Sequence, residues 1–80
     1  MTVTALLFAS YADAFGADSV VLDLRPGATI ADAVDALRSR PGGSVLPSSP
    51  LVAVNLVYAD ARDTLEHGDE VAIIPPVAGG

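Results

Sequence analysis

The chain of 80 residues contains no cysteine, no tryptophan and no lysine. Without cysteine it cannot form disulfides, thiolate zinc sites or iron–sulfur clusters, and it has no cysteine nucleophile. No apolar run approaches the length of about 20 residues that a membrane-spanning helix needs, and the N-terminus lacks the basic and apolar regions of a signal peptide. These absences predict a cytoplasmic protein that makes no contact with a membrane.

Basic side chains are also scarce, with four arginines against ten acidic residues and a net charge of −6. Proteins that bind nucleic acids neutralise phosphates with a basic stripe, whereas Arg25, Arg38, Arg40 and Arg62 are scattered, so we expect no nucleic-acid partner. The acidic residues between positions 60 and 70 are typical of a solvated turn region. We therefore expect no metal site and no bound cofactor.

Apolar and β-branched runs predict four strands. They cover residues 2–9, 19–24, 51–58 and 70–74. Residues 10–15 are long enough for only a turn or two of helix. Proline and serine in residues 44–50 indicate a loop, and residues 59–69 read as turns with a candidate short strand at Thr64 and Leu65.

One segment has the pattern of an amphipathic helix, because its apolar residues recur at the i, i+3, i+4, i+7 spacing. These residues are Ile30, Ala33, Val34 and Leu37. Thr29 and Asp32 are spaced as a variant capping box at its start. Arg38 and Arg40 are expected in its last turn, before the proline and two glycines that end it at positions 41–43.

Together these elements predict an α+β fold, a mixed sheet with one main helix across one face. Strands 2–9, 51–58 and 70–74 are apolar on both faces, however, and one helix can cover only one of them. The other face either is covered by loops or exposes an apolar patch, and such a patch usually marks a partner site.

The last ten residues, VAIIPPVAGG, carry no charged side chain and no nucleophile, so the terminal carboxylate of Gly80 is their reactive group. Pro75 and Pro76 must take the chain out of the sheet, and the terminal glycines have no Cβ, which allows them to enter a narrow channel. We therefore divide the chain into a domain of residues 1–74 and an extended tail of residues 75–80. A carboxylate reacts only after activation, most simply as an acyl-adenylate that another enzyme makes with ATP.

The segment DTLEHGDEVAIIPPVAGG, at positions 63–80, resembles the C-terminus of MoaD-type proteins, the small subunits of molybdopterin synthase. The opening LLFA at positions 6–9 and the AVN segment at positions 53–55 also fit, so the resemblance covers almost the whole chain. It implies the ubiquitin-like β-grasp fold. It also implies a sulfur carrier, not an enzyme by itself, whose Gly80 is adenylated and then converted to a thiocarboxylate.

The resemblance further implies partners. An adenylyltransferase of the ubiquitin-activating type would act with a sulfur donor, and the tail would then insert into the synthase large subunit within a heterotetramer. There the sulfur would pass to cyclic pyranopterin monophosphate during molybdenum cofactor biosynthesis. The inserted residues would be Pro75, Pro76, Val77, Ala78 and Gly79. Phe8 and Ile74 match apolar partner-facing positions of the family, and with Leu6 and Ala72 they form the expected interface.

Members of the family often carry an Arg-Glu pair in the short first helix, where this chain has Ala12 and Asp13. Three alternatives share its main features. Sulfur carriers for thiamine or cysteine synthesis also end in Gly-Gly, a protein modifier would attach Gly80 to lysines of its targets, and a plain interaction domain would have an idle tail. The Pro-Pro-Val sequence before the last three residues favours the molybdopterin branch.

Overall fold

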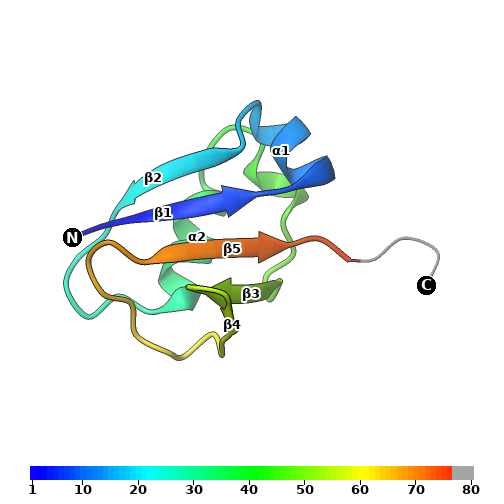
Figure 1. The fold of residues 1–80 in the computed structure, drawn as a ribbon. Helices are drawn as coiled ribbons and strands as arrows, with labels where there is room; N and C mark the ends of the chain where they lie inside the picture. The colour runs from blue at the N-terminus through cyan, green and yellow to red at the C-terminus, as the bar shows by residue number, and fades with distance from the viewer. Residues whose placement is uncertain (77–80) are drawn as a thin grey trace.

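The computed structural model describes residues 1–76, which form five strands, two α-helices and one 3-10 helix. In chain order the elements are β1 (Thr2–Leu7), α1 (Ala9–Phe15), β2 (Ser19–Asp23), α2 (Ile30–Arg38), the 3-10 helix η1 (Gly43–Val45), β3 (Leu51–Val54), β4 (Val57–Tyr58) and β5 (Glu70–Ile74). The strands form one sheet in the order β2-β1-β5-β3-β4, in which β1 and β5 are parallel and the other neighbours antiparallel. Helix α2 lies behind the sheet (Figure 1). The predicted α+β fold, with a mixed sheet and one main helix across one face, is confirmed.

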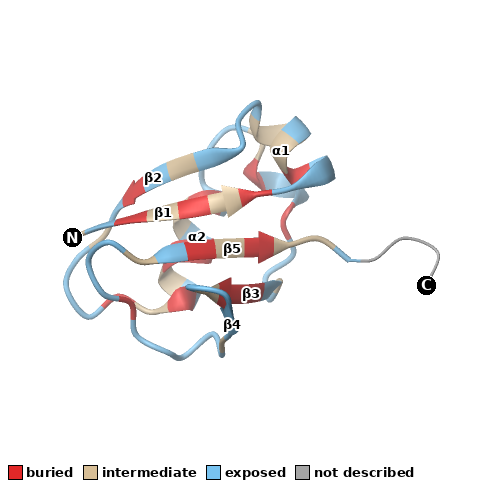
Figure 2. Ribbon diagram, viewed as in Figure 1, coloured by how far each residue is buried: buried red, intermediate tan, exposed pale blue. Residues whose placement is uncertain are grey.

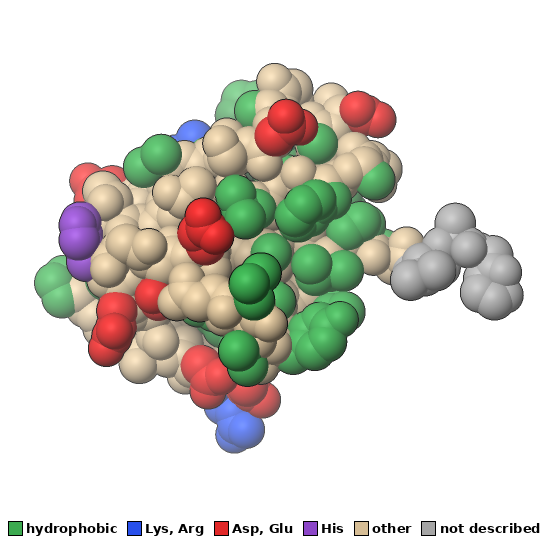
Figure 3. Space-filling view, in the orientation of Figure 1, with side chains coloured by type: hydrophobic (Ala, Val, Ile, Leu, Met, Phe, Trp, Pro, Cys, Tyr) green, Lys and Arg blue, Asp and Glu red, His purple; other side chains and the backbone are tan. Residues whose placement is uncertain are grey.

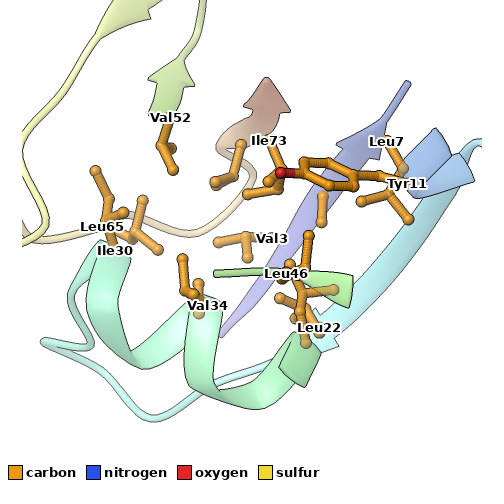
Figure 4. Close-up of a cluster of buried hydrophobic side chains, with 14 residues drawn as sticks. Val3, Leu7, Tyr11, Leu22, Ile30, Val34, Leu46, Val52, Leu65 and Ile73 are labelled. Atoms are coloured by element: carbon orange, nitrogen blue, oxygen red, sulfur yellow. The ribbon is translucent and has the colours of Figure 1, made fainter. Parts of the chain in front are cut away.

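The core lies between α2 and the sheet. Alternate residues of the central strands point toward the helix and are buried, namely Val3, Ala5 and Leu7 of β1 and Val71 and Ile73 of β5. The four apolar residues of the predicted helical stripe meet them, and each is at most 2% exposed. Figure 2 shows the buried residues along the central strands, and Figure 4 shows the side chains of both layers meeting. Burying apolar surface at about 25 cal/mol per Å² makes this layer the main source of stability.

Local hydrogen bonds determine where α2 begins. The backbone N–H of Asp32 donates to Oγ1 of Thr29 over 3.3 Å, and the backbone N–H of Thr29 donates to Oδ2 of Asp32 over 2.9 Å, which confirms the capping box. The hydrogen bond from the Thr29 backbone holds the pKa of the Asp32 carboxyl below its usual value. Within residues 1–76, no helix combines the length and the apolarity needed to cross a bilayer.

At its other end α2 stops at Arg38, so the expectation that Arg40 lies in the last turn is wrong. Arg40 follows the helix and its Nη2 donates to the carbonyl oxygen of Val21 over 3.1 Å. This bond crosses to the edge strand β2. The charge of Arg40 therefore serves a tertiary contact rather than the end of the helix dipole.

The expected strand over residues 51–58 is also wrong, because the chain reverses in its middle. Asn55 and Leu56 have φ values of 50° and 73°, and positive φ at both central residues is what a two-residue type I′ hairpin turn requires. β3 and β4 then pair antiparallel, with Val54 opposite Val57. The side-chain oxygen of Asn55 accepts a hydrogen bond from the backbone N–H of Glu70 over 3.0 Å, which ties the turn to β5.

The second turn residue is unfavourable in this backbone conformation. Replacing Leu56 by glycine is expected to raise the free energy of unfolding by about 0.5–1 kcal/mol. Left-handed φ costs residues other than glycine about 1–2 kcal/mol, and the larger conformational entropy that glycine loses on folding offsets part of this gain. The Leu56 side chain is 95% exposed, so its loss removes little packing. Urea denaturation measures the change. Leu56→Ala is the control: equal stabilisation by alanine would mean that the exposed side chain, not the backbone, is the cause.

Candidate functional site

One face of the sheet is not covered by a helix within residues 1–76 (Figure 1). Residues paired across neighbouring strands share a face of the sheet, so the register identifies the side chains on this open face. Leu6 of β1 pairs with Ala72 of β5, and Ile74 of β5 pairs with Leu51 of β3. Three of the four predicted interface residues, Leu6, Ala72 and Ile74, therefore lie together, and each is half-buried.

The fourth predicted residue, Phe8, lies just beyond the sheet. β1 ends at Leu7 and not at Ala9 as expected, because Ala9 has a left-handed φ of 48° that turns the chain into α1. Phe8 is the N-cap residue of that helix and is 45% exposed. Because β1 and β5 are parallel and Leu7 pairs with Ile73, Phe8 and Ile74 lie at the same end of the sheet.

Two further aromatic or aliphatic side chains lie on this face beside Ile74 and were missed. Leu51 is 52% exposed and Tyr58 is 71% exposed. In a continuous strand the odd and even positions would put them on opposite faces, but the hairpin pairs Tyr58 with Ala53, two residues from Leu51, and brings both to the open face. The signal in the sequence was Asn55, a residue that favours the first position of such a turn.

We define the open-face patch as the group of apolar side chains around the ends of β1 and β5. Its members are Leu6, Phe8, Leu51, Tyr58, Ala72 and Ile74. In Figure 3 hydrophobic side chains gather on the side of this face from which the C-terminal end of the chain leaves, and acidic side chains lie around them. An apolar area bordered by charged groups is the usual form of a protein docking surface.

Charged groups near the hairpin interact with one another. Nε of Arg62 lies 3.1 Å from Oδ1 of Asp60, and hydrogen bonds from the backbone N–H and side chain of Arg62 lower the pKa of the Asp60 carboxyl. Both side chains are more than half exposed, so the pair contributes little to stability. Within the described residues, no three histidine, aspartate or glutamate side chains are grouped as metal ligands would be.

The chain leaves the sheet directly beside the open-face patch. β5 ends at Ile74, Pro75 is half-buried and Pro76 is exposed. Neither proline has an N–H, so neither can donate to a neighbouring strand. The remaining predicted site residues, Val77, Ala78, Gly79 and Gly80, lie outside the described residues. Activation at the terminal carboxylate therefore stays a prediction, while the position from which the tail starts is known.

A five-stranded mixed sheet with one main helix across its back, together with a chain that leaves a central strand beside an apolar face, defines a protein of the ubiquitin-like β-grasp class. The chain belongs to the ThiS family, whose model matches residues 5–80. It is 32% identical over 79 residues to the molybdopterin synthase sulfur carrier subunit of Arabidopsis thaliana. The aligned region covers 98% of this chain and 82% of that protein. The resemblance to MoaD-type proteins is thus confirmed.

Solved structures share this fold. Small archaeal modifier protein 1 from Haloferax volcanii has a TM-score of 0.85 and 30% identity, over 95% of this chain and 98% of that one. A chain in the complex of subunits 1 and 2 of the molybdopterin-converting factor from Helicobacter pylori has a TM-score of 0.73 and 20% identity, over the full length of both chains. The second likeness concerns the fold alone.

Proposed function

We propose that this protein is the sulfur carrier subunit of a molybdopterin synthase, acting in the cytoplasm with Gly80 as the carrier residue. The observation that carries the proposal is that the apolar open-face patch and the start of the C-terminal tail lie at the same end of the molecule. A partner seated on the patch is therefore placed to receive the tail. The similarity to a curated sulfur carrier subunit supports the same assignment.

The proposed chemistry takes place on the main chain. An activating enzyme uses ATP to convert the Gly80 carboxylate to an acyl-adenylate, with release of pyrophosphate. Sulfur from a donor then attacks the carbonyl carbon, and AMP leaves to give a thiocarboxylate. No side chain of residues 75–80 is a nucleophile or an acid, so this subunit supplies the sulfur atom and its partners supply the catalytic groups. ATP belongs to the activating enzyme and is not a cofactor of this chain.

The acceptor would be cyclic pyranopterin monophosphate, held by the large subunit. In this proposal the open-face patch binds the large subunit, residues 75–79 enter it, and the terminal sulfur attacks the pterin precursor. Water then cleaves the bond between the sulfur and the Gly80 acyl carbon, so the sulfur stays on the pterin and Gly80 regains its carboxylate. Two large subunits with one carrier at each end would form the heterotetramer. A chain in the Helicobacter pylori complex of two subunits has the same fold as this chain. This likeness supports the proposal that a carrier of this shape binds a second subunit.

A second candidate function is protein modification, in which a lysine amine attacks the same activated Gly80. The similarity to a protein called a small archaeal modifier favours it. The two functions share the adenylation step and differ in the nucleophile that follows. This chain has no lysine, so it could not be modified on its own lysine side chains in either case.

Mass spectrometry of the protein isolated from its native cells tests the proposal. We expect a fraction of intact chains to be heavier by the mass difference between a sulfur and an oxygen atom, with the added mass in the C-terminal fragment. This fraction should vanish when the activating enzyme is deleted. Chains found only as conjugates on lysines of other proteins would replace the carrier proposal with the modifier function.

A further inference from the structure

A groove runs beside the point where the chain leaves β5. Its volume is about 610 Å³, and its walls come from α1, from the segment between η1 and β3, and from the ends of β3, β4 and β5. The lining includes Tyr11, Val45, Pro50, Leu51 and Pro75. Within the described part of the chain no charged residue lines it, although the molecule as a whole is strongly acidic. The groove thus suits an uncharged and largely apolar occupant.

The groove contains one polar group whose environment is unusual. Tyr11 is only 5% exposed, and Figure 4 shows its ring reaching from α1 across the end of the core, with the hydroxyl oxygen on the side of Ile73. No group of residues 1–76 forms a hydrogen bond with this hydroxyl. The same residues contain no sealed side-chain oxygen or nitrogen without a partner, so the hydroxyl is not closed off in the core, and Tyr11 is one of the residues that line the groove.

We propose that the groove binds an extended, uncharged segment of the protein that receives the tail, and that a backbone carbonyl of this segment accepts a hydrogen bond from the Tyr11 hydroxyl. A buried tyrosine whose hydroxyl has no partner within residues 1–76 is suited to this role, because its ring is held by the core and its donor meets the partner without further ordering. The inference takes the identity of the partner, the large subunit, from the proposed function. The groove shares Leu51, Tyr58 and Ile74 with the open-face patch, and the inference extends the contact region from there to α1 and to the segment between η1 and β3.

The position of the groove favours this occupant over the two others that an apolar groove admits. Pro75 and Pro76 form part of its wall, so whatever fills it touches the base of the tail. A second copy of the chain would bring two molecules of net charge −6 together, and like net charge opposes association. A small-molecule site buries most of the surface of its ligand, whereas this groove is open along one side.

The test of the hydroxyl is the Tyr11→Phe variant, with binding to the purified large subunit measured by titration calorimetry. Because a neutral hydrogen bond contributes about 0.5–1.5 kcal/mol, we expect Kd to rise about two- to twelvefold. The melting temperature of the isolated chain should stay the same, since the hydroxyl has no partner within residues 1–76. Equal affinity of the variant and the wild-type chain would overturn the hydrogen bond, and with it this inference.

A second pair of variants tests the groove without depending on one hydrogen bond. Val45 lines the groove and is 47% exposed, whereas Val57 lies on the edge strand β4, is 68% exposed and is on the helix side of the sheet, because it pairs with Val54 and Val54 pairs with the buried Val71. We expect Val45→Asp to raise Kd at least tenfold, because the occupant would desolvate an unpaired carboxylate, and we expect Val57→Asp to leave it unchanged. Equal effects of the two substitutions would overturn the groove as a binding region. Failure of the wild-type chain itself to bind the large subunit would overturn the proposed function and the partner named here.

Discussion

Deletion of Gly80 is expected to abolish sulfur transfer while leaving the fold unchanged. Removing one residue withdraws the terminal carboxylate by about 3.3–3.6 Å, and misplacing a reacting group by about 1 Å already costs on the order of 100-fold in rate. The buried side chains of β5 end at Ile73, so no core contact within the described residues is lost. Complementation of a strain that lacks the sulfur carrier measures transfer, and urea denaturation measures stability.

Two companion variants make the result specific to the position of the carboxylate. Adding one residue after Gly80 should be as damaging as the deletion, because it moves the reactive group in the other direction. Leu56→Ala leaves the tail unchanged and alters a 95% exposed side chain outside the open-face patch, so it should retain most of the activity. Full complementation by the chain that lacks Gly80 would refute the tail mechanism.

Replacement of Phe8 by aspartate is expected to raise Kd for the large subunit by about 30-fold or more, since aromatic residues at the centre of an interface contribute about 2 kcal/mol or more. Stability should change much less. Phe8 is 45% exposed and caps α1 without a side-chain hydrogen bond, and aspartate is among the best residues at an N-cap position. Calorimetric titration gives Kd and thermal unfolding gives the melting temperature.

The matched control is Val57→Asp, which adds the same charge at another exposed apolar residue. Val57 lies on the edge strand β4 and pairs with Val54, which is on the helix side of the sheet, away from the open-face patch. Its substitution should leave Kd unchanged. If Phe8→Asp kept its affinity but lost much of its melting temperature, Phe8 would belong to the core and not to the docking surface.

Local patterns were enough to predict the main elements of the fold. The spacing of Ile30, Val34 and Leu37 predicts the buried face of α2, and Thr29 with Asp32 predicts where the helix begins, because both depend on residues within two turns of each other. Because β1 and β5 are apolar on both faces, the pattern also predicts that the face away from the helix is either covered by loops or exposed as an apolar patch. Those expectations needed no knowledge of distant contacts.

The wrong or incomplete predictions concern features of the fold that depend on contacts between residues far apart in the chain. Asn55 with Leu56 is a weak turn signal because it lacks glycine, and the bond from Glu70 that holds the turn comes from another strand. The glycines after α2 were interpreted only as a helix stop. In the structure, a Cβ at Gly42 would overlap the carbonyl oxygen of Ala14, and one at Gly43 would overlap that of Leu37. Both positions therefore need glycine for close packing as well.

The sequence by itself determined the absence of cysteine and lysine, the amphipathic helix and the Gly-Gly terminus. From these came the proposed class of chemistry, in which another enzyme activates a main-chain carboxylate. Only the tertiary structure decided that Leu51 and Tyr58 join Leu6, Phe8 and Ile74, and that Tyr11 lines a groove at the base of the tail. The physical reason is that strand register and the hairpin turn assign side chains to faces, and register depends on pairing between residues far apart in the chain.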